Sequence, residues 1–156
     1  MRIVYIECKE CGLRFRKNRT MYVATAAGDR VKCIHPLETY MAWDALKPEL
    51  CWLQRKLHSA PESLFDLFEI NGTVTTLKKL FGFKDFKELL LSRKGYLSWY
   101  YCRTCNSKIE LDADKDTMAC PECNSPDVVY SHDLIGGNCP QCSDGMIVSR
   151  NTGMIT

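Results

Sequence analysis

The stretch of sequence that decides the fold is WYYCRTCNSKIELDADKDTMACPECNSPDVVY, residues 99–130. It contains two C-x-x-C pairs, Cys102/Cys105 and Cys120/Cys123, with fourteen residues between them. Apolar residues flank the pairs, and a polar run in the middle favours the tip of a short hairpin. Two cysteines three apart on a tight turn can direct both sulfurs at one tetrahedral Zn²⁺, at about 2.3 Å each. The stretch therefore predicts short strands around a site made of four cysteines.

These residues resemble a zinc ribbon, a fold shared by many transcription, translation and DNA-maintenance proteins. The resemblance implies a β module held together by a structural Zn²⁺, since four cysteines leave no open position for catalysis. It implies no particular partner, because the same fold serves many functions.

A second opening pair stands near the start of the chain, in YIECKECGLRFRKNR, residues 5–19. Cys8 and Cys11 are followed by Gly12, which suits the positive φ of the turn after such a pair. The pattern C-x-x-C-G-x-x-F is similar to the opening of small regulatory-type zinc ribbons. It predicts a second metal site, for which two other ligands are needed.

Two sets of residues can close this second site. A local closure uses Cys33 and His35, although their C-x-H spacing is unusual for a closing pair. A long-range closure uses Cys139 and Cys142, in CPQCSDGMIVS, which has the same pattern as CPECNSPDVVY from Cys120. The CPxCxxGxIVxR stretch is also similar to half of a topoisomerase-type C4 zinc finger. The long-range closure is favoured because it uses every C-x-x-C pair, and both alternatives give two structural Zn²⁺ ions.

The rest of the chain predicts helices in its middle and an α+β fold, with two small zinc-ribbon β modules flanking a central helical segment. Apolar residues at helical spacing and Pro48 favour several short helices there. We expect four segments: an N-terminal zinc-knuckle segment, a helical domain, a Cys₄ zinc ribbon and a C-terminal zinc knuckle that can complete the N-terminal site. Their boundaries are 1–35, 36–95, 96–131 and 132–156.

Composition narrows the class of protein. Of 156 residues, 46% are apolar and 26% charged, which suits a folded chain and argues against global disorder. No apolar run reaches the roughly 18 residues of a membrane span, and no export signal precedes Cys8. We therefore expect a cytoplasmic protein with reduced cysteines and no membrane partner. Common catalytic motifs are also absent, which disfavours an enzyme.

Charge suggests a partner for the first segment. Residues 1–35 contain eight Lys or Arg against three Asp or Glu, and the basic side chains gather around Phe15. Such a patch can bind phosphates while an aromatic ring stacks on a base. The candidate residues for nucleic acid are Arg14, Phe15, Arg16, Lys17 and Arg19.

The sequence thus predicts a zinc-binding, non-catalytic adaptor that contacts nucleic acid or a nucleic-acid-processing complex. The alternative is a protein-interaction or assembly subunit whose zinc sites are purely structural. Both hypotheses allow a protein partner.

Overall fold

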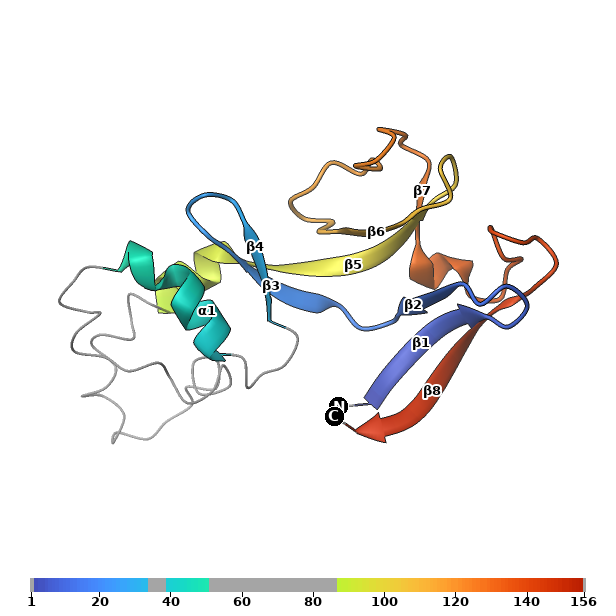
Figure 1. Cartoon of the computed structure of the whole chain (residues 1–156), viewed down its shortest axis with the longest axis horizontal. Coiled ribbons are helices and arrows are strands. Elements are labelled where there is room, and N and C mark those ends of the chain that lie inside the picture. The colour runs from blue at the N-terminus through green and yellow to red at the C-terminus, as the bar shows by residue number, and fades with distance from the viewer. Residues whose placement is uncertain (1, 34–38, 51–86, 156) are drawn as a thin grey trace. The chain divides into compact units, whose positions relative to one another are not determined.

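The structure of the chain is a computed structural model that describes residues 2–33, 39–50 and 87–155. The chain divides into two compact units (Figure 1). The first unit combines Met1–Arg19 with Tyr96–Thr156, and the second is Thr20–Gly95. Residues of the predicted N-terminal segment are therefore shared between the two units.

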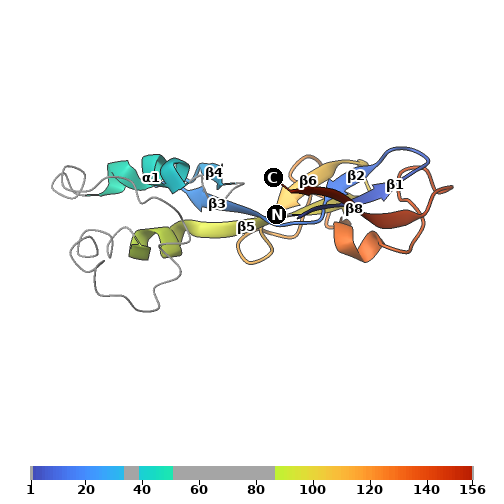
Figure 2. The same ribbon diagram turned by 90° about the horizontal axis from the view of Figure 1, so that it is seen from below.

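The two ends of the chain form one sheet in the first unit. Strand β1 (Arg2–Cys8) pairs antiparallel with both β2 (Arg14–Arg16) and β8 (Ile147–Ile155), so the strand order is β2-β1-β8. Figures 1 and 2 both show the first and last strands lying side by side. The register places Cys8 opposite Ile147, so the first C-x-x-C pair lies next to the end of the chain that carries the last pair.

A second set of strands in this unit carries the other two C-x-x-C pairs. The long strand β5 (Lys94–Cys102) pairs antiparallel with β6 (Lys108–Leu111) and with β7 (Val128–Tyr130). Its aromatic residues suit a pleated, largely buried surface. A short 3-10 helix, η3 (Ser131–Leu134), follows β7 and leads to the last pair.

The described residues of the first unit form two small hydrophobic clusters. One cluster contains Ile6, Phe15, Tyr101, Leu134 and Ile147, together with cysteines of the terminal pairs. The Phe15 and Tyr101 rings meet edge to face, with centroids 6.3 Å apart. The other cluster is built from Tyr100, Cys102, Ile109, Leu111 and Cys120. Cysteines thus belong to both cores, and neither core is large.

The described residues of the second unit form a hairpin and helical segments. Strands β3 (Thr20–Ala24) and β4 (Arg30–Cys33) pair antiparallel, and helix α1 (Thr39–Leu46) packs against them (Figure 2). The 3-10 helix η1 (Lys47–Glu49) follows, with Pro48 in its first turn as expected from the fixed φ of proline. Residues 87–93 form a further helix. The core of the second unit contains Val23, Cys33, Trp43, Leu46 and Leu90.

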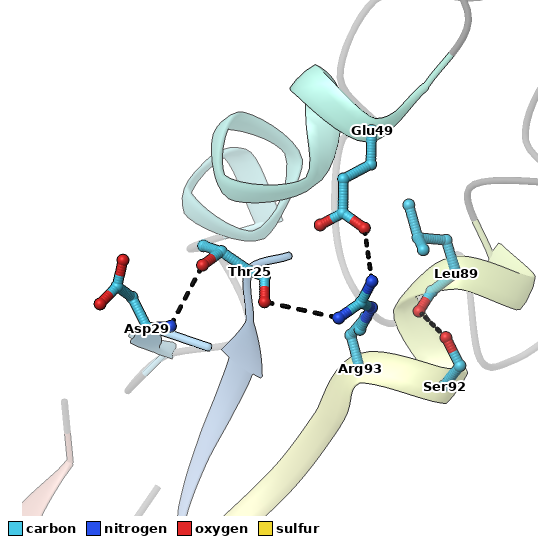
Figure 3. Close-up of polar contacts among 6 residues, drawn as sticks. All are labelled: Thr25, Asp29, Glu49, Leu89, Ser92 and Arg93. Carbon is cyan, nitrogen blue, oxygen red and sulfur yellow. Dashed lines mark hydrogen bonds and ion pairs between the residues drawn. The ribbon is translucent and has the colours of Figure 1, made fainter. Parts of the chain in front are cut away.

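An ion pair joins η1 to the helix at residues 87–93. Arg93 Nη2 lies 2.7 Å from Glu49 Oε2, and Arg93 Nη1 donates to the Thr25 carbonyl at 3.4 Å (Figure 3). The Arg93 and Glu49 side chains are 35% and 17% exposed, so the pair is partly shielded from water. One guanidinium therefore connects η1, the end of β3 and the helix at residues 87–93.

The α+β class predicted from the sequence is confirmed, and strands outnumber helices in the described part of the chain. The predicted helices between residues 51 and 86 lie outside the described residues, and the arrangement of ribbons flanking a helical segment stays a prediction. Among the residues that the structure describes, no helix has the length and apolarity needed to cross a membrane.

Candidate metal centres

All four C-x-x-C pairs sit in the same kind of turn. The fourth residue after the first cysteine has a positive φ in each: Gly12 at 75°, Asn106 at 57°, Asn124 at 59° and Ser143 at 62°. Glycine adopts this left-handed conformation freely, and asparagine adopts it more readily than most other residues. The turn curls the chain back so that both sulfurs of a pair face the same side. Sequence alone reveals this repeat, because glycine or asparagine follows three of the pairs.

Backbone hydrogen bonds lock these turns. The first cysteine of each pair donates its amide to a carbonyl beyond the second: Cys8 to Leu13 at 2.8 Å, Cys102 to Ser107 at 2.9 Å, Cys120 to Ser125 at 2.8 Å, and Cys139 to Gly145 at 2.6 Å. The last turn is one residue longer than the other three. The pairs are therefore positioned by main-chain geometry, which brings both sulfurs of a pair to the same side of its turn.

The ribbon predicted at residues 99–130 has its four sulfurs together. The Cys102 and Cys123 Sγ atoms are 3.6 Å apart, as are those of Cys105 and Cys120. All four sulfurs lie within 4.8 Å of one another. A tetrahedron with metal–sulfur bonds of about 2.3 Å has sulfur–sulfur edges of about 3.8 Å, so the spacing fits one tetrahedral metal ion.

A second cluster joins the two ends of the chain. The Cys8 and Cys142 sulfurs are 3.8 Å apart, and those of Cys11 and Cys139 are 3.5 Å apart. These four sulfurs also lie within 4.8 Å of one another. The cysteines of each contact are 134 and 128 residues apart in the sequence. Of the two closures left open by the sequence, the structure has the long-range one.

Cys33 has a different environment. It is 4% exposed in the core of the second unit, and its sulfur lies 3.7 Å from the Val31 carbonyl. His35, its partner in the local closure, lies outside the described residues. No disulfide involves any of the nine cysteines that the structure describes, so both clusters consist of free thiols.

Close packing around the terminal cluster explains why residue 145 is a glycine. A Cβ atom placed on Gly145 would overlap the sulfur of Cys8 and lie 2.9 Å from the Glu10 Cγ atom. Gly145 also supplies the carbonyl that accepts the Cys139 amide. The chain can approach Cys8 this closely only because position 145 has no side chain.

The thiol pKa values within each cluster are split. In the terminal cluster the Cys11 backbone amide is the main cause that lowers the pKa of Cys8 to about 7. The Leu13 amide acts in the same direction on Cys11, but burial and three neighbouring thiols raise the pKa of Cys11 to about 12. The ribbon repeats this split, because the Ser107 hydrogen bond lowers the pKa of Cys105 to about 7, while that of Cys123 rises to about 12.

This split follows from the crowding of acidic groups. Once one thiol of a cluster has lost its proton, like charge disfavours ionisation of its neighbours. The four sulfurs of a cluster could all ionise, with release of protons, if they held a divalent cation that offset this repulsion. The clusters can therefore hold a metal ion, and a closed shell of four sulfurs leaves no position for a substrate.

The basic residues predicted to contact nucleic acid lie in and after β2. Arg14 and Arg16 alternate with Phe15, which is 2% exposed and packed on Tyr101. The buried Phe15 ring is not available to stack on a base. The Lys17 amide donates to the Val4 carbonyl at 2.8 Å. Arg19 is the last residue of the N-terminal part of the first unit, Met1–Arg19.

Other residues on this sheet were not singled out from the sequence. Tyr5 and Glu7 on β1 contact Arg14, and Glu7 also contacts Arg150 on β8. The alternation of Tyr5, Ile6 and Glu7 could have indicated an outward Tyr5 and Glu7 on this strand. The position of Arg150 could not be inferred, because its pairing joins opposite ends of the chain.

No protein-family model, curated protein or solved structure matches this chain.

Proposed function

We propose that each cysteine cluster holds one Zn²⁺ as a structural ion, and that the protein is a non-catalytic adaptor for nucleic acid or a nucleic-acid-processing complex. The observation that carries the metal assignment is the gathering of eight cysteine sulfurs into two sets, each within 4.8 Å. Their spacing matches the edges of a tetrahedral four-sulfur site.

Zinc suits both clusters better than harder cations. Thiolates are soft ligands that select zinc or iron rather than magnesium or calcium, and tetrahedral four-sulfur geometry is typical of structural zinc. Both hydrophobic clusters of the first unit are small and include the cysteines themselves. A structural Zn²⁺ supplies about 10–16 kcal/mol of binding free energy in zinc-finger peptides, which is folding free energy when the unfolded chain has no site.

The sheet that the terminal cluster closes supports the adaptor role. It closes a three-stranded sheet whose strands bear Arg14, Arg16 and Arg150, in a unit that is basic at its N-terminal end. Arginine is the preferred side chain for phosphate groups, because its planar fork matches their oxygens. A closed metal shell fits a scaffold rather than a catalytic centre.

Metal counting by native mass spectrometry tests this function. The wild-type chain is expected to carry two Zn²⁺ ions, and Cys8→Ser, Cys139→Ser and Cys102→Ser are each expected to carry one. Cys33→Ser is the matched control, because this cysteine is buried outside both clusters, and it is expected to keep two ions. A metal-free wild-type chain that keeps its fold in chelator would refute the assignment.

A second candidate function is a protein-assembly subunit with the same structural ions. Ile135 and Met146 are 38% and 60% exposed and flank the last C-x-x-C pair. Exposed apolar side chains mark a protein interface where they gather into one contiguous patch. This candidate is favoured if a stoichiometric protein partner survives nuclease treatment and is lost from Met146→Ser, while affinity for oligonucleotides is unchanged.

A further inference from the structure

The outward face of the terminal sheet carries a compact group of arginines around one tyrosine. Residues paired directly across antiparallel strands point to the same side of the sheet. Tyr5 is paired with Arg16 on β2 and with Arg150 on β8, and Glu7 is paired with Arg14. These five residues therefore share one face, called the arginine face below.

The buried carboxylate of this face holds two of its arginines in place. Glu7 is only 12% exposed, and its Oε2 and Oε1 atoms lie 3.4 Å from Arg14 Nε and 3.3 Å from Arg150 Nη1. The two arginine side chains are 46% and 66% exposed. The negative charge is thus covered while the positive charges face solvent, and three arginines against one glutamate leave the face positive.

Most donors of these arginines remain available to a ligand. A guanidinium has five N–H donors. Glu7 accepts a hydrogen bond from Arg150 and forms an ion pair with Arg14. Arg16 makes no ion pair with any residue in the described ranges. Guanidinium groups with free, forked donors bind phosphate oxygens in pairs.

The planar guanidinium of Arg14 also offers a flat surface for stacking. Its Cζ atom lies 3.5 Å from the centroid of the Tyr5 ring, so the guanidinium rests on that ring. With Glu7 holding its Nε, Arg14 is fixed before any ligand arrives, which lowers the entropy lost on binding. Nucleic-acid bases stack on arginine planes as well as on aromatic rings.

We infer that the arginine face binds single-stranded nucleic acid, with phosphates on Arg16 and Arg150 and a base stacked on the Arg14–Tyr5 pair. The charge suits a phosphate backbone, and the flat cation requires a base that is not already stacked in a duplex. This inference rests on the proposed function, because the terminal metal cluster closes the sheet that bears the face.

Fluorescence anisotropy with labelled 15-nucleotide RNA and DNA single strands tests the inference on the zinc-loaded full chain. Arg16→Gln is expected to weaken binding about tenfold at about 50 mM salt, and each arginine removed is expected to reduce the salt slope by about one. Arg14→Lys keeps the charge but loses the plane, so affinity is expected to fall while the salt slope stays unchanged. Comparing the RNA and DNA strands shows which of the two is preferred.

Arg103→Gln is the matched control. Arg103 is also exposed, at 54%, and pairs with Asp127 at 3.9 Å, but it lies in the turn of the ribbon cluster. It is expected to bind like the wild type. Each variant is first checked for two bound ions, and Arg16→Gln breaks no ion pair seen in the described residues.

Several results would overturn the inference. One is equal loss in Arg103→Gln and the face variants, and another is an unchanged salt slope in Arg16→Gln. Duplex binding as tight as single-strand binding, or equal competition by polyglutamate, would point to another ligand. A chain with two ions that binds no oligonucleotide at low salt would refute this face and leave the structural metal sites standing.

Discussion

Replacing Gly145 by alanine adds a side-chain atom where residue 145 lies tightly against Cys8. The added Cβ would overlap the Cys8 sulfur and press on the Glu10 side chain at 2.9 Å. Glu10 is exposed and can move, whereas the Cys8 sulfur is buried and fixed by its turn. Overpacking of this kind typically costs about 1–3 kcal/mol. The terminal cluster of Gly145→Ala is therefore expected to bind zinc about 5- to 150-fold more weakly, with no change at the ribbon.

Competition against a chromophoric zinc chelator measures this difference, because the two sites then release their ions at different chelator concentrations. Gly137→Ala is the control: its Cβ would make only an ordinary contact of 3.4 Å with the Leu134 carbonyl. It is expected to release both ions as the wild type does. Equal zinc affinity in Gly145→Ala and the wild type would refute the close approach of residue 145 to Cys8.

Three further substitutions test packing and polar contacts in the two units. Phe15→Ala removes a ring that is 2% exposed and meets Tyr101 edge to face, so the free energy of unfolding in urea is expected to fall by about 3–5 kcal/mol; a loss below about 1 kcal/mol would show that the ring is not in the core. Asp112→Ala removes a buried carboxylate that accepts hydrogen bonds from the Tyr96 amide at 3.3 Å and the Asp114 amide at 3.1 Å. The free energy of unfolding in urea is expected to fall by about 1–3 kcal/mol. Asp114→Ala, which removes an exposed carboxylate, is the control. Glu49→Gln breaks the ion pair with Arg93 in the second unit, so hydrogen exchange at residues 87–93 is expected to become faster. The zinc affinities of both clusters, which lie in the first unit, are expected to stay unchanged. Altered zinc release would contradict this expectation.

The ribbon cluster was accessible to sequence reasoning because its ligands are close in the chain. Cys102 and Cys123 are 21 residues apart, and the pairing of β5 with β7 brings them together. The terminal cluster was harder, because Cys8 and Cys142 meet through strands at opposite ends of the chain. Pattern similarity favoured that pairing, but only the register of β1 with β8 brings those cysteines together.

Phe15 shows a second limit of prediction from the sequence. Its arginine neighbours suggested a ring within a basic patch, yet alternation along a strand puts Phe15 on the face opposite to Arg14 and Arg16. Which face is buried depends on what packs there, and here it is Tyr101 from a distant strand. The ring on the basic face is Tyr5, which lies beside Arg14 only because β1 and β2 pair.

X-ray absorption at the zinc edge of the purified chain tests the central claim most directly. Two closed cysteine clusters predict sulfur as the only first neighbour, four per zinc at about 2.3 Å. A shell that includes nitrogen or oxygen would contradict the account, since a histidine or water would then replace one of the eight cysteines.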